Sequence, residues 1–396
     1  MPHSNCSVCL PPTTSFSAKP IGTLDALARM LQHSVQELQY IATTADQRYR
    51  VIRIPKDGGG FRECFDALGP LKSIHGRLLH MILEAVNYPL YLQGSIKDRS
   101  SPRGQKANAE QHINPQTLIT VDIKRFFASV KRPIVFDIWH RFFRFPPRVA
   151  DILATLTTKA GCLPQGTKTS ALLANLVFWD IESHVVSDFH ERGIRYTRLI
   201  DDVSCSSKTP LTHEQMSYVM TRLQAMVRRK GLRLHSSRKK KSMARANQQQ
   251  VTTKLVVNRK TSLPHDRRSA TRAAVHALRR VPMNLRATAT YLKKFRHASG
   301  LVSYLQQHHQ TEGEQLRALL RDLRPQDPAD EGSGDQKPAD WTHSELGEVS
   351  TTVFLPLSAV PAFLCTFRDC GLDRIRHLSP VSEDSTQLSV SEPVIA

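Results

Sequence analysis

The sequence predicts an α+β protein of several domains, because strand-like segments joined by a tight turn occur together with a long C-terminal stretch of helix-like segments. Short β-rich runs flank a tight turn at residues 196–205, which favours an antiparallel hairpin. Residues 267–323 contain helical patterns alone. The chain has 396 residues, which is long enough for about two or three domains with buried cores.

Composition limits the classes of protein to which this chain can belong. Lys and Arg number 55 against 35 Asp and Glu, so the formal net charge is +20. No apolar run is long enough for a membrane-spanning helix, and residues 1–20 lack the pattern of a secretory signal. The 7 cysteines are scattered and predict no disulfide framework. We therefore expect a cytoplasmic protein with no role at a membrane.

The positive charge is concentrated in the C-terminal half of the chain. Residues 228–245 contain nine basic side chains and no acidic one, and the segment from Arg267 to Arg296 has the same count. One short run is typical of a solvated surface, but two long acid-free stretches favour a nucleic-acid partner, whose counterions Lys and Arg displace. The nucleic-acid contacts that we expect are Arg238, Lys239, Lys240, Lys241, Lys254, Arg267 and Arg268.

The N-terminal elements are predicted in chain order. Residues 1–20 are rich in Pro, Ser and Thr, which is typical of a flexible tail. From Leu24 to Leu38 the apolar positions keep helical spacing. Tyr49–Ile54 predicts a strand that leads into the glycine turn of a hairpin, and Leu71–Val86 predicts a helix. The β-branched run Thr117–Ile123 predicts a buried strand.

The C-terminal elements follow the same reasoning. The predicted helices are Pro133–Phe143, Ser170–Phe189 and Glu214–Lys230, and short strands are expected near Arg233 and at Thr253–Val257. Residues 325–345 are rich in Pro, Gly and Asp, which predicts a linker or insertion. Beyond this linker lies the apolar segment Val353–Phe367. It is followed by the polar stretch 379–392, and for this stretch alone we expect no regular structure.

Three carboxylates are notable in this basic chain. Asp122 ends the predicted strand 117–123, while Asp201 and Asp202 occupy the hairpin turn. Each residue alone is typical of a cap or a turn. Together they predict a cation site, because adjacent carboxylates repel one another and Mg²⁺ prefers oxygen ligands. If the fold brings the strand end beside the hairpin, they suit phosphoryl transfer with two ions about 3.5–4 Å apart.

Seven motifs follow one another in a fixed order. They are IPKDGGGFR, NAEQH, VDIKRFFASV, LPQGTKTSALLANLV, RYTRLIDDVSCSS, GLRLHSSRKK and LVVNRK. In this order they resemble a bacterial reverse transcriptase of the retron and group II intron type, and in particular a divergent defence-associated relative. The resemblance implies a right-hand polymerase with fingers, a palm of antiparallel sheet with helices, and a helical thumb. The implied divisions are a flexible tail at 1–20, fingers with the N-terminal helix at 21–115, the palm with finger elements at 116–258, the helical thumb at 259–324, the linker or insertion at 325–345 and a partly disordered C-terminal extension at 346–396.

The resemblance also implies the catalytic residues. Asp122, Asp201 and Asp202 match the metal-binding aspartates of the palm, and Ile123 lies beside them in the implied metal-binding set. The implied cofactor is Mg²⁺, as two ions, with Mn²⁺ as an alternative.

The implied nucleotide contacts come from three motifs. Lys56 and Arg62 match finger residues that grip the triphosphate, although an ordinary basic hairpin has the same pattern. Gln165 and Gly166 match the loop that contacts the incoming nucleotide. Phe127 matches the bulky side chain that would clash with a 2′-hydroxyl and so select deoxynucleotides, although plain core packing also suits a phenyl ring.

Some positions mark the branch of the family and others depart from it. Asn108, Ala109 and His112 spell an Asn-Ala-x-x-His pattern that resembles the retron branch. Leu199 and Ile200 replace the Tyr-Ala that usually precedes the acidic pair, and Thr252–Lys254 replaces the Val-Thr-Gly of retron enzymes. The metal ligands are kept, so the departures favour altered primer or template handling.

The function implied by the resemblance is RNA-directed DNA synthesis in antiphage defence. The implied partners are a noncoding RNA as template or scaffold, dNTPs, the DNA product, and a second polymerase or an effector protein. Two alternatives remain open. The same site would also suit untemplated or protein-primed DNA synthesis, and the altered hairpin would suit a catalytically silent RNA-binding scaffold that partners another polymerase.

Overall fold

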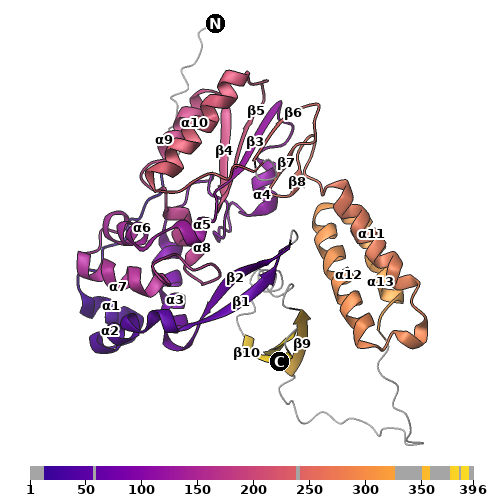
Figure 1. Cartoon of the computed structure of the whole chain (residues 1–396), viewed down its shortest axis with the longest axis horizontal. Helices are drawn as coiled ribbons and strands as arrows, with labels where there is room; N and C mark the ends of the chain where they lie inside the picture. The colour runs from indigo at the N-terminus through magenta and orange to yellow at the C-terminus, as the bar shows by residue number, and fades with distance from the viewer. Residues whose placement is uncertain are drawn as a thin grey trace, which may run out of the picture. The chain divides into compact units, whose positions relative to one another are not determined.

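The computed structural model describes residues 13–56, 59–237 and 241–325, together with the backbone of strands at 350–356, 375–382 and 385–391. Internal contacts divide the chain into two compact units. The first consists of Met1–Ile52 with Glu63–His265, and the second of Arg53–Arg62 with Asp266–Ala396. Within the described residues, no helix combines the length and apolar character needed to cross a membrane. Helices and antiparallel strands together confirm the α+β class (Figure 1).

The first unit contains most of the helices. They are α1 (Leu24–Leu31), α2 (Val35–Thr43), α3 (Gly69–Met81), α4 (Gln105–Glu110), α5 (Phe126–Ser129), α6 (Arg132–Asp137), α7 (Pro147–Thr157), α8 (Ser170–Leu176), α9 (Glu182–Glu191) and α10 (His213–Arg229). Short 3₁₀ turns at Ala45–Gln47 and Leu83–Ala85 and a π-helical turn at Ile138–Phe142 extend this set.

A four-stranded antiparallel sheet forms the centre of the first unit, in the order β4-β5-β3-β6. Its strands are β4 (Ile194–Leu199), β5 (Asp202–Ser207), β3 (Thr117–Asp122) and β6 (Lys241–Arg245). The apolar residues of β3 are buried on both faces, as its β-branched run predicts. The sequence predicts no strand at β6, because its basic residues hide the pattern. Exposed charge of this kind protects an edge strand from pairing with other chains.

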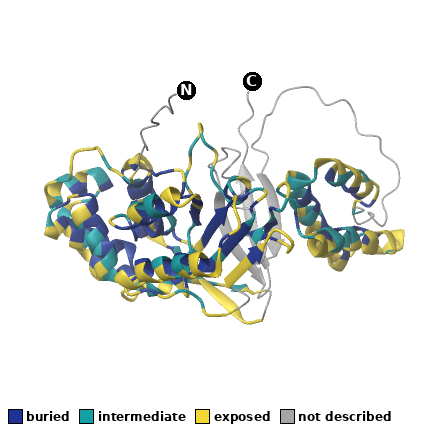
Figure 2. Ribbon diagram, turned by 90° about the horizontal axis from the view of Figure 1, so that it is seen from above, coloured by how far each residue is buried: buried dark blue, intermediate teal, exposed yellow. Residues whose placement is uncertain are grey.

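Different elements cover the two faces of this sheet. The ring of Tyr196 on β4 lies 6.2 Å from that of Phe189 on α9. The next residue, Thr197, bonds to His112 just after α4. Because successive side chains of a strand point to opposite faces, α9 lies on one face and α4 on the other. The strands between them are largely buried (Figure 2).

Two of the predicted helices are interrupted. The segment 24–38 forms α1 and α2, because Gln32 adopts a left-handed conformation with φ of 61° and Ser34 starts the second helix with a capping box. The expected helix Ser170–Phe189 is likewise divided into α8 and α9, and Ile181 before α9 is not helical, with φ of −134°. Local backbone chemistry overrides the apolar periodicity in both places.

Two predicted strands are shorter than expected. The segment near Arg233 contributes an isolated bridge between Leu234 and Ile123. The expected strand Thr253–Val257 is reduced to β8 (Leu255–Val256), which forms a small hairpin with β7 (Val251–Thr252). The intervening Thr253 and Lys254 have positive φ values of 46° and 66°, so they form the turn.

Among the described residues, the second unit contains the tip of a hairpin, three helices and a small sheet. The hairpin strands are β1 (Tyr49–Pro55) and β2 (Phe61–Ala67), and the helices are α11 (His265–Arg279), α12 (Ala289–His308) and α13 (Gln310–Asp322), with a 3₁₀ turn at Met283–Leu285. The sheet has the order β10-β11-β9, with β9 (Ser350–Pro356), β10 (Ile375–Ser382) and β11 (Ser385–Ser391). The polar stretch 379–392 thus contains strands that the sequence does not predict. The predicted linker lies, from residue 326 onward, outside the described residues.

Candidate active site

The acidic residues lie at one end of the sheet, where β3 and β5 pair. Asp122 and Asp202 are direct Cα partners, so their side chains share one face. Asp201 lies in the turn between β4 and β5, and its carbonyl accepts a hydrogen bond from the Ile123 N–H at 2.9 Å. On the other side of β3, the His235 N–H donates to the Asp122 carbonyl at 2.8 Å. The fold therefore brings together carboxylates that lie far apart in the sequence.

The donor chemistry at this end of the sheet fits Mg²⁺. Like charges directly opposite one another destabilise an antiparallel pair, and a cation would reverse that effect. Asp122 is buried while Asp202 is exposed, so the carboxylate pair is open to solvent on the side of Asp202. The described part of the chain holds no group of three or more His, Cys, Asp or Glu side chains already arranged as a metal site. Mg²⁺ needs no such cage, because one or two carboxylates hold it together with water and substrate phosphates.

The predicted nucleotide contacts of the first unit lie on α5 and on the loop before α8. Phe127 is partly buried, and its ring centroid lies 5.9 Å from that of Phe126. The Gln165 carbonyl accepts a hydrogen bond from the Phe65 N–H of β2 at 2.7 Å. Gly166 has φ of 104°, and a Cβ there would lie 3.3 Å from the Phe65 carbonyl oxygen. Conformation and space both favour glycine at this point of the loop.

Lys56 and Arg62 flank the tip of the β1–β2 hairpin and are exposed. The Lys56 N–H donates to the Gly60 carbonyl at 3.0 Å, and the Gly59 N–H donates to the Lys56 carbonyl at 3.0 Å. Both glycines have positive φ values, which confirms the predicted glycine turn. The tip belongs to the second compact unit, whereas the carboxylates belong to the first.

The predicted nucleic-acid contacts have different surroundings. Lys241 begins β6 and is exposed, and Lys254 is exposed in the β7–β8 turn. On α11, Arg267 is exposed, whereas Arg268 forms an ion pair with Glu312 of α13 at 2.7 Å. The remaining three, Arg238, Lys239 and Lys240, lie outside the described residues.

The Asn-Ala-x-x-His pattern contributes to the fold. His112 is buried, and its two ring nitrogens lie 2.7 Å from the hydroxyls of Ser206 and Thr197. Burial, with a smaller effect of the nearby Arg195, lowers the pKa of His112 to about 3. The ring is therefore neutral near pH 7, and it ties the end of α4 to β4 and β5.

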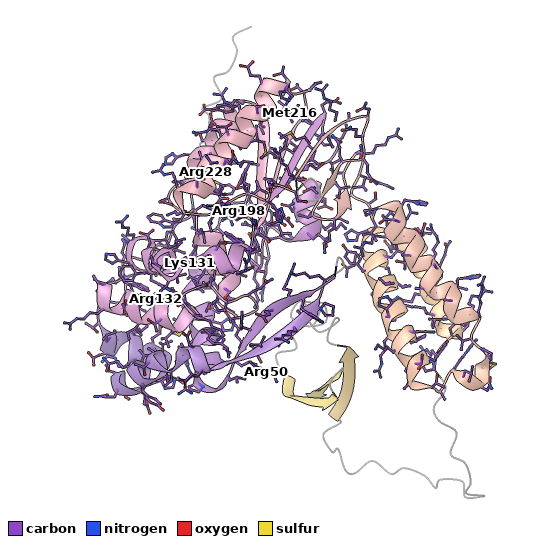
Figure 3. The ribbon with its side chains drawn as sticks, viewed as in Figure 1. Arg50, Lys131, Arg132, Arg198, Met216 and Arg228 are labelled. Carbon is purple, nitrogen blue, oxygen red and sulfur yellow. The ribbon has the colours of Figure 1, made fainter. Side chains whose placement is uncertain are left out.

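A buried ion pair behind the acidic turn is a feature that the motifs do not identify. Arg198, which is labelled in Figure 3, is fully buried. It donates to both carboxylate oxygens of Glu182, at 2.6 and 2.7 Å. The Tyr196 hydroxyl donates to the same carboxylate at 2.6 Å. The sequence gives one signal for this buried pair. Strand alternation places Arg198 on the same buried face of β4 as Tyr196, and an arginine in a core requires an acidic partner.

Comparisons with known proteins agree with these observations. Residues 54–309 match a family model described as Reverse transcriptase (RNA-dependent DNA polymerase). The chain is 27% identical over 313 residues to the Retron Se72 reverse transcriptase of Salmonella heidelberg (strain 579083-10), covering 78% of this chain and 82% of that protein. It is 26% identical over 321 residues to the Retron Ec48 reverse transcriptase of Escherichia coli, covering 78% of each. It is 25% identical over 259 residues to the Retron Ec86 reverse transcriptase of Escherichia coli, covering 65% of this chain and 78% of that protein.

Proposed function

Because this chain belongs to the family of reverse transcriptases (RNA-dependent DNA polymerases), we propose that it copies a noncoding RNA by extending a 3′-hydroxyl with dNTPs, in antiphage defence. The similarity to retron reverse transcriptases over most of the chain supports an RNA partner of this kind. The observation that carries the proposal is the acidic end of the sheet, where Asp122 lies opposite Asp202 and Asp201 occupies the adjoining turn.

In this proposal, the carboxylates of Asp122, Asp201 and Asp202 are the catalytic metal ligands. Two Mg²⁺ ions, or Mn²⁺, when bound, would activate the attacking 3′-hydroxyl and offset the charge of the triphosphate. The Ile123 position contributes through its backbone, because its N–H bonds to the Asp201 carbonyl and so ties the turn to β3.

The nucleotide is proposed to meet residues from three segments. Gln165 and Gly166 form a loop whose backbone is fixed against β2, which supports a role in positioning the base. Phe127 is partly exposed on α5, just after β3, which supports contact with the sugar. Lys56 and Arg62 carry exposed positive charge suited to the triphosphate.

Nucleic-acid contacts are proposed for basic residues of the first unit and, separately, for basic residues of the second. Residues 116–258 would form the palm and residues 259–324 the thumb. Their Lys and Arg side chains would contact phosphates by shape, without reading a sequence. Arg268 takes part in an ion pair with Glu312, so its contribution to such contacts is proposed to be the smallest.

The proposal is tested with protein purified together with its bound RNA. Labelled dNTPs and Mg²⁺ are added to the wild type and to the Asp201→Ala/Asp202→Ala variant, and both the product and the co-purified RNA are sequenced. DNA made by the wild type alone and complementary to that RNA is the expected result. Carboxylate-dependent DNA that matches no RNA would indicate untemplated synthesis. Bound RNA without synthesis by either form would indicate a scaffold.

A further inference from the structure

We infer that Arg198 and Glu182 form a positioning pair for the acidic turn, and that Gly94 provides the space into which this turn packs. The inference rests on the proposed function, since it concerns how the chain presents Asp201. These residues are positioning residues, because each acts through Ile200 rather than through substrate.

Ile200 is the point of strain in the hairpin. It lies between β4 and Asp201 and has φ of 59°. A β-branched side chain is rarely found in this left-handed region, where tight hairpin turns usually place Gly, Asn or Asp. A strained conformation of this kind persists only where the surroundings hold it. The orientation of the next residue, Asp201, therefore depends on the contacts that keep Ile200 in this conformation.

Arg198 holds the turn from inside the protein. Its Nη1 donates to the Ile200 carbonyl at 3.0 Å, and its Nη2 donates to the Asn175 carbonyl at 2.9 Å. The same guanidinium bonds to both carboxylate oxygens of Glu182 and lies 5.2 Å from the ring of Phe178. A planar guanidinium has fixed donor directions. The backbone of the turn is thereby linked to α8 and α9 through one rigid group.

The pair acts from the face of the sheet opposite the carboxylates. Leu199 is the Cα partner of Asp202, and Asp202 is that of Asp122, so these positions share one face. Arg198 precedes Leu199 directly, and its side chain therefore points to the other face. The guanidinium contacts the acidic turn through the Ile200 carbonyl.

Gly94 provides a second support for the turn. A Cβ on Gly94 would overlap the Ile200 side chain and lie 3.0 Å from the Ile200 backbone nitrogen. The absence of a side chain at Gly94 thus gives space to Ile200, which is bulkier than the alanine usual in the family. The Asn175 side-chain amide donates to the Gly94 carbonyl at 2.7 Å, so both supports meet at Asn175.

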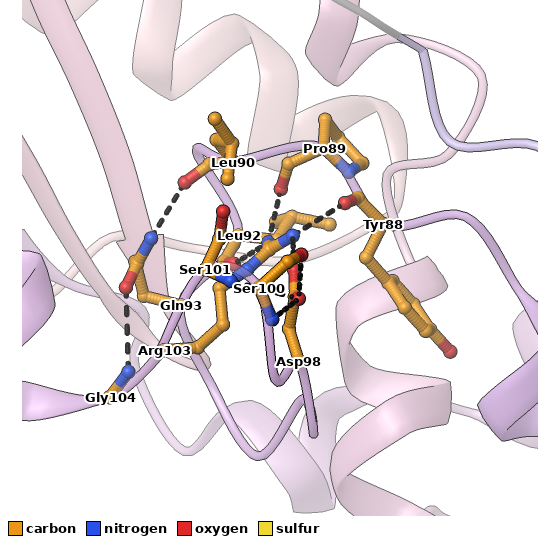
Figure 4. Close-up of polar contacts among 10 residues, drawn as sticks. All are labelled: Tyr88, Pro89, Leu90, Leu92, Gln93, Asp98, Ser100, Ser101, Arg103 and Gly104. Carbon is orange, nitrogen blue, oxygen red and sulfur yellow. Dashed lines mark hydrogen bonds and ion pairs between the residues drawn. The ribbon is translucent and has the colours of Figure 1, made fainter.

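The segment that carries Gly94 is itself fixed. The Gln93 N–H donates to the Arg198 carbonyl at 2.8 Å, and the Arg198 N–H donates to the Tyr91 carbonyl at 2.8 Å. The Arg103 guanidinium donates to three carbonyls of this segment, those of Tyr88, Pro89 and Leu92 (Figure 4). A collision between Gly94 and Ile200 would therefore move the turn, because the segment has little freedom to yield.

The packing of Gly94 against Ile200 is tested by a double-mutant cycle. Gly94→Ala should lower kcat for single-nucleotide addition by about 10- to 100-fold, as expected for a misplaced catalytic group. Ile200→Ala removes the side-chain atoms that the new Cβ would overlap and leaves the 3.0 Å approach to the backbone nitrogen, so the double variant should recover most of that loss. Gly22→Ala is the matched control, since a Cβ there meets nothing within 4 Å.

The ion pair is tested with Arg198→Lys. This variant keeps the positive charge but lacks the planar guanidinium that donates to both carboxylate oxygens of Glu182. We expect kcat to fall with little change in KM for dNTP, and amide hydrogen exchange across residues 199–202 to become faster. Leu153→Ala, a core truncation in α7, controls for lost stability. It should lower the melting temperature without changing exchange at the turn.

The outcomes separate this inference from the proposed function. Wild-type rates in Gly94→Ala, no recovery in the double variant, or unchanged exchange in Arg198→Lys would overturn the positioning role. If the wild type makes no DNA, the proposed function fails instead. Hydrogen exchange at the turn then still supports or overturns the positioning role, because it needs neither metal nor synthesis.

Discussion

Asp122 and Asp202 lie directly opposite one another, at the last position of β3 and the first position of β5. Two carboxylates in this relationship weaken the pairing of the strands that carry them. A protein keeps such a pair where function requires it, because sites built for chemistry often reduce stability. The first prediction follows from this relationship.

Replacing Asp202 by Asn should stabilise the protein in metal-free buffer while removing DNA synthesis. Relief of the cross-strand repulsion is expected to raise the free energy of unfolding by up to about 1 kcal/mol. Urea unfolding in the presence of a chelator measures it. Asp188→Asn is the control and should lose stability, because Asp188 accepts hydrogen bonds from Tyr218, Arg192 and Arg222. A loss of stability in Asp202→Asn would contradict the prediction.

Truncation of Phe127 should weaken the discrimination against ribonucleotides. If Phe127 contacts the sugar as proposed, Phe127→Val opens space for a 2′-hydroxyl, so the ratio of kcat/KM for dCTP over CTP should fall by about 10- to 100-fold. Phe126→Leu is the control, because Phe126 is buried and stacks on Phe178. That variant should lose stability and keep its discrimination. An unchanged ratio in Phe127→Val would limit Phe127 to core packing.

Gly166→Ala should impair nucleotide binding more than Gly161→Ala. Both glycines have positive φ, so both variants carry backbone strain of about 1 kcal/mol or more. Only at Gly166 does the added Cβ meet neighbouring atoms, at 3.3 Å from the Phe65 carbonyl oxygen. KM for dNTP should therefore rise in Gly166→Ala alone. Equal values of KM in the two variants would argue against a role of this loop.

Stability should fall on acidification because of His112. Its pKa is about 3 in the folded protein and 6.5 when unperturbed, so the unfolded chain binds more protons between these values. Within that window each pH unit lowers the unfolding free energy by up to about 1.4 kcal/mol, and above pH 6.5 the effect is absent. In urea unfolding at pH 7.5 and 5.5, the stability gap between the wild type and His112→Asn should narrow at the lower pH. A constant gap would contradict this account.

The salt dependence of RNA binding should separate Lys254 from Arg268. Lys254→Ala is expected to reduce the slope of log K against log salt by about 1, as one phosphate contact is lost. Arg268→Ala should change that slope less and lower the melting temperature, because Arg268 is paired with Glu312. Filter binding over a salt series measures the slopes. Equal slopes for Lys254→Ala and the wild type would remove Lys254 from the interface.

Local patterns predict the centre of the site well. The β-branched run before Asp122 gives the strand, and the acidic pair gives the hairpin, but the turn is formed by Ile200 and Asp201, and the predicted turn residue Asp202 instead begins β5. Apolar periodicity is less informative about where helices stop, since a single left-handed residue, Gln32, divides α1 from α2. Nor does it detect β6, whose sequence is basic and whose pairing partner β3 lies far away in the chain.

The support of the acidic turn is the part that the sequence alone does not provide. Arg198 lies within the motif RYTRLIDDVSCSS and Glu182 lies outside all seven motifs, so no motif predicts the ion pair that these two residues form through tertiary contact. Gly94 has an ordinary loop sequence around it, and its role depends on the Ile200 side chain that packs against it. Such relationships are non-local, so they become visible only when the fold brings the segments together.

The most direct test of the central claim measures single-nucleotide addition by the wild type and by Asp122→Asn at equal Mg²⁺ concentration. If Asp122 is a metal ligand, the rate should fall by about 10³-fold, equivalent to about 4 kcal/mol of transition-state stabilisation. The melting temperature of the variant should be equal to or higher than that of the wild type. A rate within about ten-fold of the wild type, at a normal melting temperature, would contradict the assignment of this end of the sheet as the active site.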